Sequence, residues 1–187
     1  MKNKKTLGPC TKYDFLQKCC EQENIVSVLG LSTKGQLDAA LVNNVTDMWT
    51  EFFIPEIVDI PKQKPDMETI DSVYTAVDII SQRVVYTPVL PDPTQTNWEG
   101  TKLTGKKLVI EGILKQKVLY TAERDEQPLH SAHFIKPFSI FIIIDGTSIR
   151  SDEFKVETYV EDVYTCRLSE RSIFKNTTIF IKAKPLC

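Results

Sequence analysis

The sequence has few of the residues on which nucleotide-binding and metal sites are usually built. Its 187 residues include only seven glycines and two histidines, and the pattern Gly-x-Gly does not occur. Phosphate-binding loops need closely spaced glycines so that backbone amides can approach the phosphate. No run comes near the ~20 apolar residues that span a bilayer. These absences argue against a nucleotide-binding loop and a membrane-spanning helix.

The chain also lacks an excess of either charge. It has 23 basic and 25 acidic residues, for a formal net charge of -2. A nucleic-acid-binding protein needs surplus lysine and arginine to displace counterions from phosphate, so that class is disfavoured. With 42% apolar and 26% charged residues, the composition is that of one soluble globular domain.

The first residues do not form a secretory signal. Residues 1–5 (MKNKK) are basic, but residues 11–23 are mostly polar and charged instead of apolar. We therefore expect synthesis and release in the cytosol. We divide the chain into an N-terminal arm, residues 1–20, and a single β-rich domain, residues 21–187.

No set of catalytic or metal-ligating residues emerges. The two histidines, His130 and His133, are three positions apart, and residues at that spacing point to opposite faces of a strand. Carboxylate pairs such as Asp66/Glu68 fit solvated surfaces better than a general acid and base. We predict a protein without catalytic activity, cofactor or metal.

The five cysteines are unevenly placed, and their odd number leaves at least one thiol without an internal partner. Cys10, Cys19, Cys20 and Cys187 lie near the ends, where thiols can reach a neighbouring chain. They are either reduced cytosolic thiols or intersubunit disulfides, and spacing does not decide between the two. The alternation of the strand places Cys166 on the same face as Tyr164 and Leu168, which looks like a core face. We therefore expect Cys166 either to pack in the core or to form a disulfide.

The residue pattern from Val73 onward is that of β-strands. Leu108, Ile110 and Val118 share one face of an extended segment, and lysines and Glu111 lie on the other. Gly112 is expected to mark a bulge or bend there. The apolar run 138–144 predicts a central, buried strand. We expect a mainly all-β fold, an antiparallel β-sandwich or flattened barrel with a Cys-bearing N-terminal arm.

An aromatic cluster precedes these strands. Trp49, Phe52 and Phe53 lie in a segment interrupted by Pro55 and Pro61, which favours an edge strand or extended loop. The cluster fits a core flap or a contact between subunits better than a carbohydrate-binding surface. We take the three aromatics as candidates for an assembly surface.

Several segments resemble the SPOCS domain of clostridial spore-coat and exosporium proteins. They are residues 106–112 (KKLVIEG), 118–122 (VLYTA) and 130–139 (HSAHFIKPFS), with weaker likeness at 60–70, 159–163 and 173–176. The resemblance covers about residues 45–183. It implies a structural or adaptor role in the spore envelope, without catalysis.

The family also implies partners and a location. One branch carries a LysM module after the domain and docks a coat ATPase, and we expect no such module here. Another branch is Cys-rich and forms disulfide-linked exosporium lattices. The resemblance thus implies a subunit that is made in the mother-cell cytosol and assembles with itself, and with other envelope proteins, at the spore surface. An adaptor that binds one coat protein without polymerising is the alternative.

Overall fold

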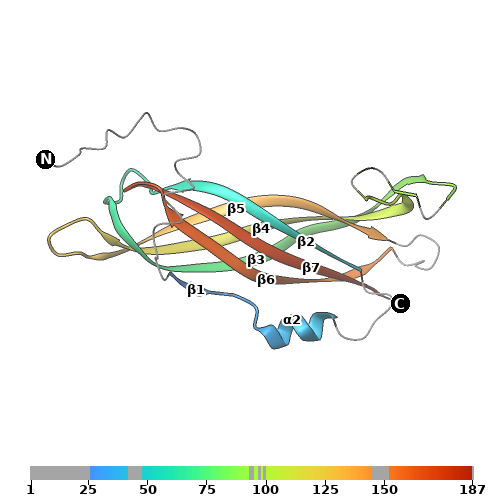
Figure 1. Ribbon diagram of the computed structural model, residues 1–187, viewed down its shortest axis with the longest axis horizontal. Helices are drawn as coiled ribbons and strands as arrows, with labels where there is room; N and C mark the ends of the chain where they lie inside the picture. Colours follow the sequence, from blue (N-terminus) through green and yellow to red (C-terminus); the bar gives the residue numbers. More distant parts are fainter. Residues whose placement is uncertain are drawn as a thin grey trace, which may run out of the picture.

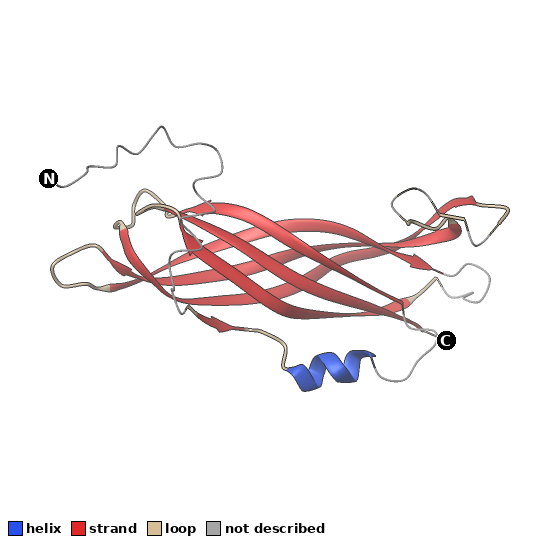
Figure 2. Ribbon diagram, viewed as in Figure 1, coloured by secondary structure: helices blue, strands red, loops and turns tan. Residues whose placement is uncertain are grey.

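The computed structural model describes residues 26–41, 48–92, 95–96, 98, 100–144 and 152–186. Long strands lie side by side in two layers, and the one helix in the described part runs along their edge (Figures 1 and 2). The elements in chain order are β1 (Ser27–Leu29), α2 (Lys34–Leu41), β2 (Met48–Asp59), β3 (Met67–Val89), β4 (Thr104–Ala122), β5 (Leu129–Ile144), β6 (Phe154–Arg167) and β7 (Ser172–Pro185).

The strands form two sheets, so the fold is a β-sandwich, as predicted. The first sheet has the order β1-β3-β4-β5, and the second has the order β2-β7-β6. All pairs are antiparallel except β1 with β3. Short loops, residues 60–66 and 123–128, connect β2 to β3 and β4 to β5.

Alternation along the strands decides which side chains lie between the sheets. Leu108, Ile110, Leu114 and Val118 of β4 are at most 1% exposed, which confirms the predicted apolar face. Burial of each such side chain contributes roughly 1.5–3 kcal/mol. The buried side chains form two clusters, one around Leu108, Ile110, Ile179 and Ile181 and the other around Met67, Val118, Tyr120 and Ile173.

The prediction of a central, buried strand at 138–144 is wrong. This segment ends β5, the last strand of the first sheet, and only one of its faces is buried. Ile142 and Ile144 point into the core, whereas Phe141 is 42% exposed. The ammonium group of Lys107 lies 4.1 Å from the centre of the Phe141 ring, a cation–π contact that lets an aromatic ring face outward.

The short helix α2 begins with a capping box. The Thr33 hydroxyl accepts a hydrogen bond from the amide of Gln36, and the Gln36 side chain accepts one from the amide of Thr33. At its other end, the carbonyl oxygen of Ala40 accepts a hydrogen bond of 2.7 Å from Lys182 of β7. The helix is therefore joined to the outer face of the second sheet.

Gly112 marks an irregularity, as expected from the sequence, but the extra residue lies in the partner strand. The register of β3 against β4 shifts between Ile79 and Ser81, directly opposite Gly112. A Cβ atom at Gly112 would lie 2.5 Å from the Phe138 ring and 2.9 Å from the carbonyl oxygen of Asp78. The glycine therefore makes room for an aromatic ring and a bulged strand.

We predict that Gly112→Ala lowers the free energy of unfolding by about 1–3 kcal/mol, because the added methyl group forces the Phe138 ring and the β3 backbone apart. Urea unfolding followed by circular dichroism measures the change. Gly35→Ala is the matched control, since a Cβ atom there meets nothing within 4 Å, and a helical alanine is at least as stable as glycine. Equal stability of the two variants would contradict the prediction.

Candidate functional site

A group of polar side chains lies between the two apolar clusters. Lys175 of β7, Glu56 of β2 and Gln116 of β4 meet there. The side chain of Lys175 is 0% exposed and that of Glu56 is 7% exposed, and Gln116 is 3% exposed. Lys175 and Glu56 are neighbours across the second sheet, whereas Gln116 approaches from the first sheet. We call these three residues the buried polar centre.

The three side chains contact one another in a closed set. The Lys175 ammonium group donates to Gln116 Oε1 and lies 3.5 Å from Glu56 Oε1. Gln116 Nε2 donates to the same Glu56 oxygen at 2.5 Å. The Phe134 ring centre is 5.9 Å from Lys175 Nζ, so an aromatic face borders the amine. One amine, one carboxamide and one carboxylate thus share a single dry site.

Burial controls the charge of the amine. Loss of hydration lowers the pKa of Lys175 from 10.5 to about 8, although the charge and hydrogen bonding of Glu56 act in the opposite direction. The neutral amine is therefore much more abundant near pH 8 than for an exposed lysine. A neutral amine is also the nucleophilic form of lysine.

The prediction from sequence missed the buried polar centre. Lys175 follows Ile173 by two positions and precedes Thr177 by two, so the two-residue period places it on the inward face of the strand. Lysine is almost never fully buried without a partner. The sequence could have revealed the site through this conflict, because a lysine at an inward position requires a partner on a facing strand.

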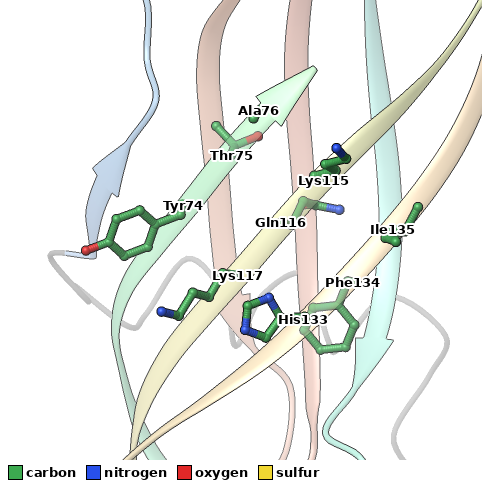
Figure 3. Close-up of a pocket in the computed structure, with 9 residues that line it drawn as sticks. All are labelled: Tyr74, Thr75, Ala76, Lys115, Gln116, Lys117, His133, Phe134 and Ile135. Carbon is green, nitrogen blue, oxygen red and sulfur yellow. The ribbon is translucent and has the colours of Figure 1, made fainter. Parts of the chain in front are cut away.

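A shallow groove crosses the outer face of the first sheet, with a volume of about 370 Å³. Figure 3 shows its lining residues on β3, β4 and β5. Tyr74, Lys117 and His133 are paired in one row across the three strands, and Ala76, Lys115 and Ile135 form the next. Lys117 Nζ lies 5.6 Å from the centre of the Tyr74 ring. The groove combines positive charge with apolar surface.

The three aromatic candidates for an assembly surface do not lie together. Phe52 faces inward, and its ring centre is 5.2 Å from that of Phe138. Trp49 and Phe53 face outward and are 56% and 67% exposed. Ile57, on the same face of β2, is 59% exposed. The outward face of β2, a strand at the edge of its sheet as predicted, therefore presents Trp49, Phe53 and Ile57 to solvent.

Of the candidate cysteines, only Cys166 lies in the described part. It is 4% exposed and disulfide-bonded. Its register opposite Phe174 puts it on the outer face of the second sheet, whereas the sequence placed it on the core face. Cys10, Cys19, Cys20 and Cys187 lie outside the described residues.

The two histidines lie on opposite faces of β5. His130 stacks on the inward-facing Tyr120, with ring centres 5.9 Å apart, and His133 lines the outer groove. Within the described ranges, no three His, Cys, Asp or Glu side chains are grouped so that they could hold a metal ion. No helix in that part of the chain has the length and apolarity needed to span a membrane.

Part of the chain matches a family model. Residues 95–167 match the model described as SipL, SPOCS domain. The match lies within the span 45–183 that was expected from sequence and includes β4, β5 and β6. It contains Gln116 and Cys166, whereas Glu56 and Lys175 fall outside it. No curated protein and no solved structure matches the chain.

We predict that Glu56→Gln destabilises the protein by about 3–5 kcal/mol, because it leaves the buried amine of Lys175 without its carboxylate partner. Chemical unfolding monitored by tryptophan fluorescence provides the measurement. Glu51→Gln on the outward face of the same strand serves as control, and we expect it to change stability by less than about 0.5 kcal/mol. Similar values for the two variants would show that Glu56 has no structural role.

Proposed function

We propose that this chain, whose residues 95–167 match the SPOCS-domain family model, is a structural subunit of the spore surface that assembles with copies of itself. The proposed location is the coat, the exosporium or a surface appendage. The family is non-enzymatic, and we propose that this chain likewise acts by assembly instead of catalysis.

The observation that carries this proposal is the outward face of β2. Trp49, Phe53 and Ile57 expose apolar surface along an edge strand. Tryptophan and phenylalanine are enriched where proteins meet, and exposed apolar patches mark contact sites. A patch that binds a different surface of the next copy generates filaments if the contacts do not close, and rings if they do.

Disulfides between subunits are the second part of the proposal. Of the five cysteines, Cys166 is already bonded, and one bond within the chain uses two of them. Three are then left, so at least one has no internal partner. A disulfide to a neighbouring copy holds both at high effective concentration, which makes a weak contact persistent. Release from the reducing mother cell would allow these bonds to form.

We predict that air oxidation of the purified chain gives a ladder of covalent oligomers on non-reducing gels, and that reductant collapses it. Serine substitutions of Cys10, Cys19, Cys20 and Cys187, made singly and together, identify the linking residues. Wild-type protein that is reduced and alkylated before exposure to air is the control and should give no ladder. Oxidised wild-type protein that stays monomeric at high concentration would refute the cross-linking.

We predict that Phe53→Lys weakens non-covalent assembly at least tenfold in reducing buffer while leaving stability within about 0.5 kcal/mol of wild type, because the side chain is exposed. Sedimentation velocity over a concentration series tests this. Ile135→Lys is a matched control, since Ile135 is also 67% exposed but lies on the other sheet. Loss of assembly in both variants, or in neither, would exclude the outward face of β2 as the contact.

An adaptor that binds one envelope protein is the second candidate function. The groove formed by Tyr74, Lys117 and His133 favours it, because a basic and aromatic surface of this size suits an acidic segment of a partner. Capture from sporulating cells separates the two functions. An adaptor would retain one dominant protein and lose it in Lys117→Glu, whereas a self-assembling subunit would chiefly retain itself.

A further inference from the structure

The buried polar centre contains every group that an amide exchange requires. The amine of Lys175 contacts the carboxamide of Gln116, and the carboxylate of Glu56 lies beside both. No other component is needed, because an amine and a carboxamide give a new amide and ammonia. The site is also dry, since the three side chains are almost completely buried.

We propose that Lys175 and Gln116 become joined by an isopeptide bond between Nζ and Cδ, which the folded protein forms by itself with Glu56 as the proton carrier. This bond would cross the sandwich from β7 of the second sheet to β4 of the first. The proposal concerns the chain's own chemistry and does not depend on the function proposed above.

The atoms and charges balance in three steps. The Lys175 ammonium gives one proton to the Glu56 carboxylate, 3.5 Å away, and Nζ then attacks Cδ of Gln116. The bond from Cδ to Nε2 breaks, and Nε2 leaves as ammonia after it receives a proton through Glu56, whose Oε1 it contacts at 2.5 Å. Of the three protons of the Lys175 ammonium group, one stays on the nitrogen of the new amide and two end on the released nitrogen, which departs as ammonium. Glu56 is again a carboxylate.

Geometry and burial both favour this reaction. Groups held in contact react as if at very high concentration, with effective molarities of about 10⁵–10⁸ M in well-oriented cases. The lowered pKa of Lys175, about 8, supplies neutral amine. In the product, the N–H of the new amide can donate to the Glu56 carboxylate in place of the ammonium group.

The bond would link strands that are neighbours in space but distant in sequence. Gln116 and Lys175 are 59 residues apart, and Lys175 lies on the middle strand of the second sheet. A cross-link that closes a long loop removes more conformational freedom from the unfolded chain than one that closes a short loop. The two sheets could then not separate on unfolding, even in reducing conditions.

Intact-mass measurement of the reduced, alkylated full-length chain tests the proposal, before and after prolonged incubation at pH 8. The expected mass is lower than the sequence mass by about 17 Da, the mass of the ammonia released when lysine acts as the nucleophile. Tryptic mapping should give one branched peptide that joins Gln116 to Lys175. An unchanged mass after incubation, or a loss that maps to another pair, would overturn the proposal.

Matched variants assign the groups. Lys175→Arg and Gln116→Met should abolish the mass loss, and Glu56→Gln should slow it at least tenfold while keeping both bonding partners. Lys182→Arg is the control, because Lys182 is also buried on β7 but contacts the carbonyl of Ala40. A mass loss that persists in Lys175→Arg would refute the assignment, as would one that disappears in Lys182→Arg.

The pH dependence of stability gives a readout that does not rely on mass. A free Lys175 amine that faces Glu56 has a pKa of about 8 in the folded protein, against 10.5 when it is unfolded. In Gln116→Met this amine stays free. Between these values the unfolded chain binds more protons, so the stability of this variant rises as pH increases from about 8 to 10.5. Wild-type protein, whose amine is acylated, should lack this rise in its urea midpoint. An equal rise in both proteins would mean that the wild-type amine is free and would overturn the proposal.

Discussion

The packing of β4 against β7 is the contact on which the rest of the molecule depends. β7 is the middle strand of its sheet and β4 an inner strand of the other, and their inward side chains supply members of both apolar clusters. This packing also buries Lys175 where its charge is unfavourable. The buried polar centre is tolerated because Glu56 and Gln116 satisfy the amine from two different sheets, which in turn fixes how the sheets lie over one another.

A polar contact in an apolar core specifies alignment at a cost in stability. If either sheet slid by two residues along a strand, Lys175 would face an apolar side chain such as Leu114 or Val118 in place of Gln116. A buried ammonium group without a partner is strongly destabilising, so the penalty for misalignment is large. The same demand for alignment brings an amine and a carboxamide into contact, so a structural constraint and a reactive geometry have a common origin.

Much of the fold could be read from the sequence, and the reasons for the exceptions are physical. The period of two in residues 108–118 identified the inward face of β4 correctly, because a half-buried strand must alternate. The same period could not show that the apolar run 138–144 lies at a sheet edge, since strand order depends on contacts between distant segments. The period also could not show that Phe52 faces the core whereas Trp49 and Phe53 face solvent, because the sequence does not say which face of β2 is buried. Lys175 was overlooked because a charged residue in an inward position makes sense only when its partners on β2 and β4 are known.

The edge strand β2 constrains how copies could meet in the proposed assembly. An open edge normally invites another strand, since its amides and carbonyls lack partners on one side. Pro55 lies in the middle of β2 and has no amide hydrogen, so an uninterrupted ladder of hydrogen bonds with a second chain cannot form along this edge. Copies would instead meet through the side chains of Trp49, Phe53 and Ile57, which are large and exposed. A contact of this kind is limited in area and easily reversed. A lasting envelope would therefore need a covalent link between subunits, and also a sandwich whose two sheets resist separation.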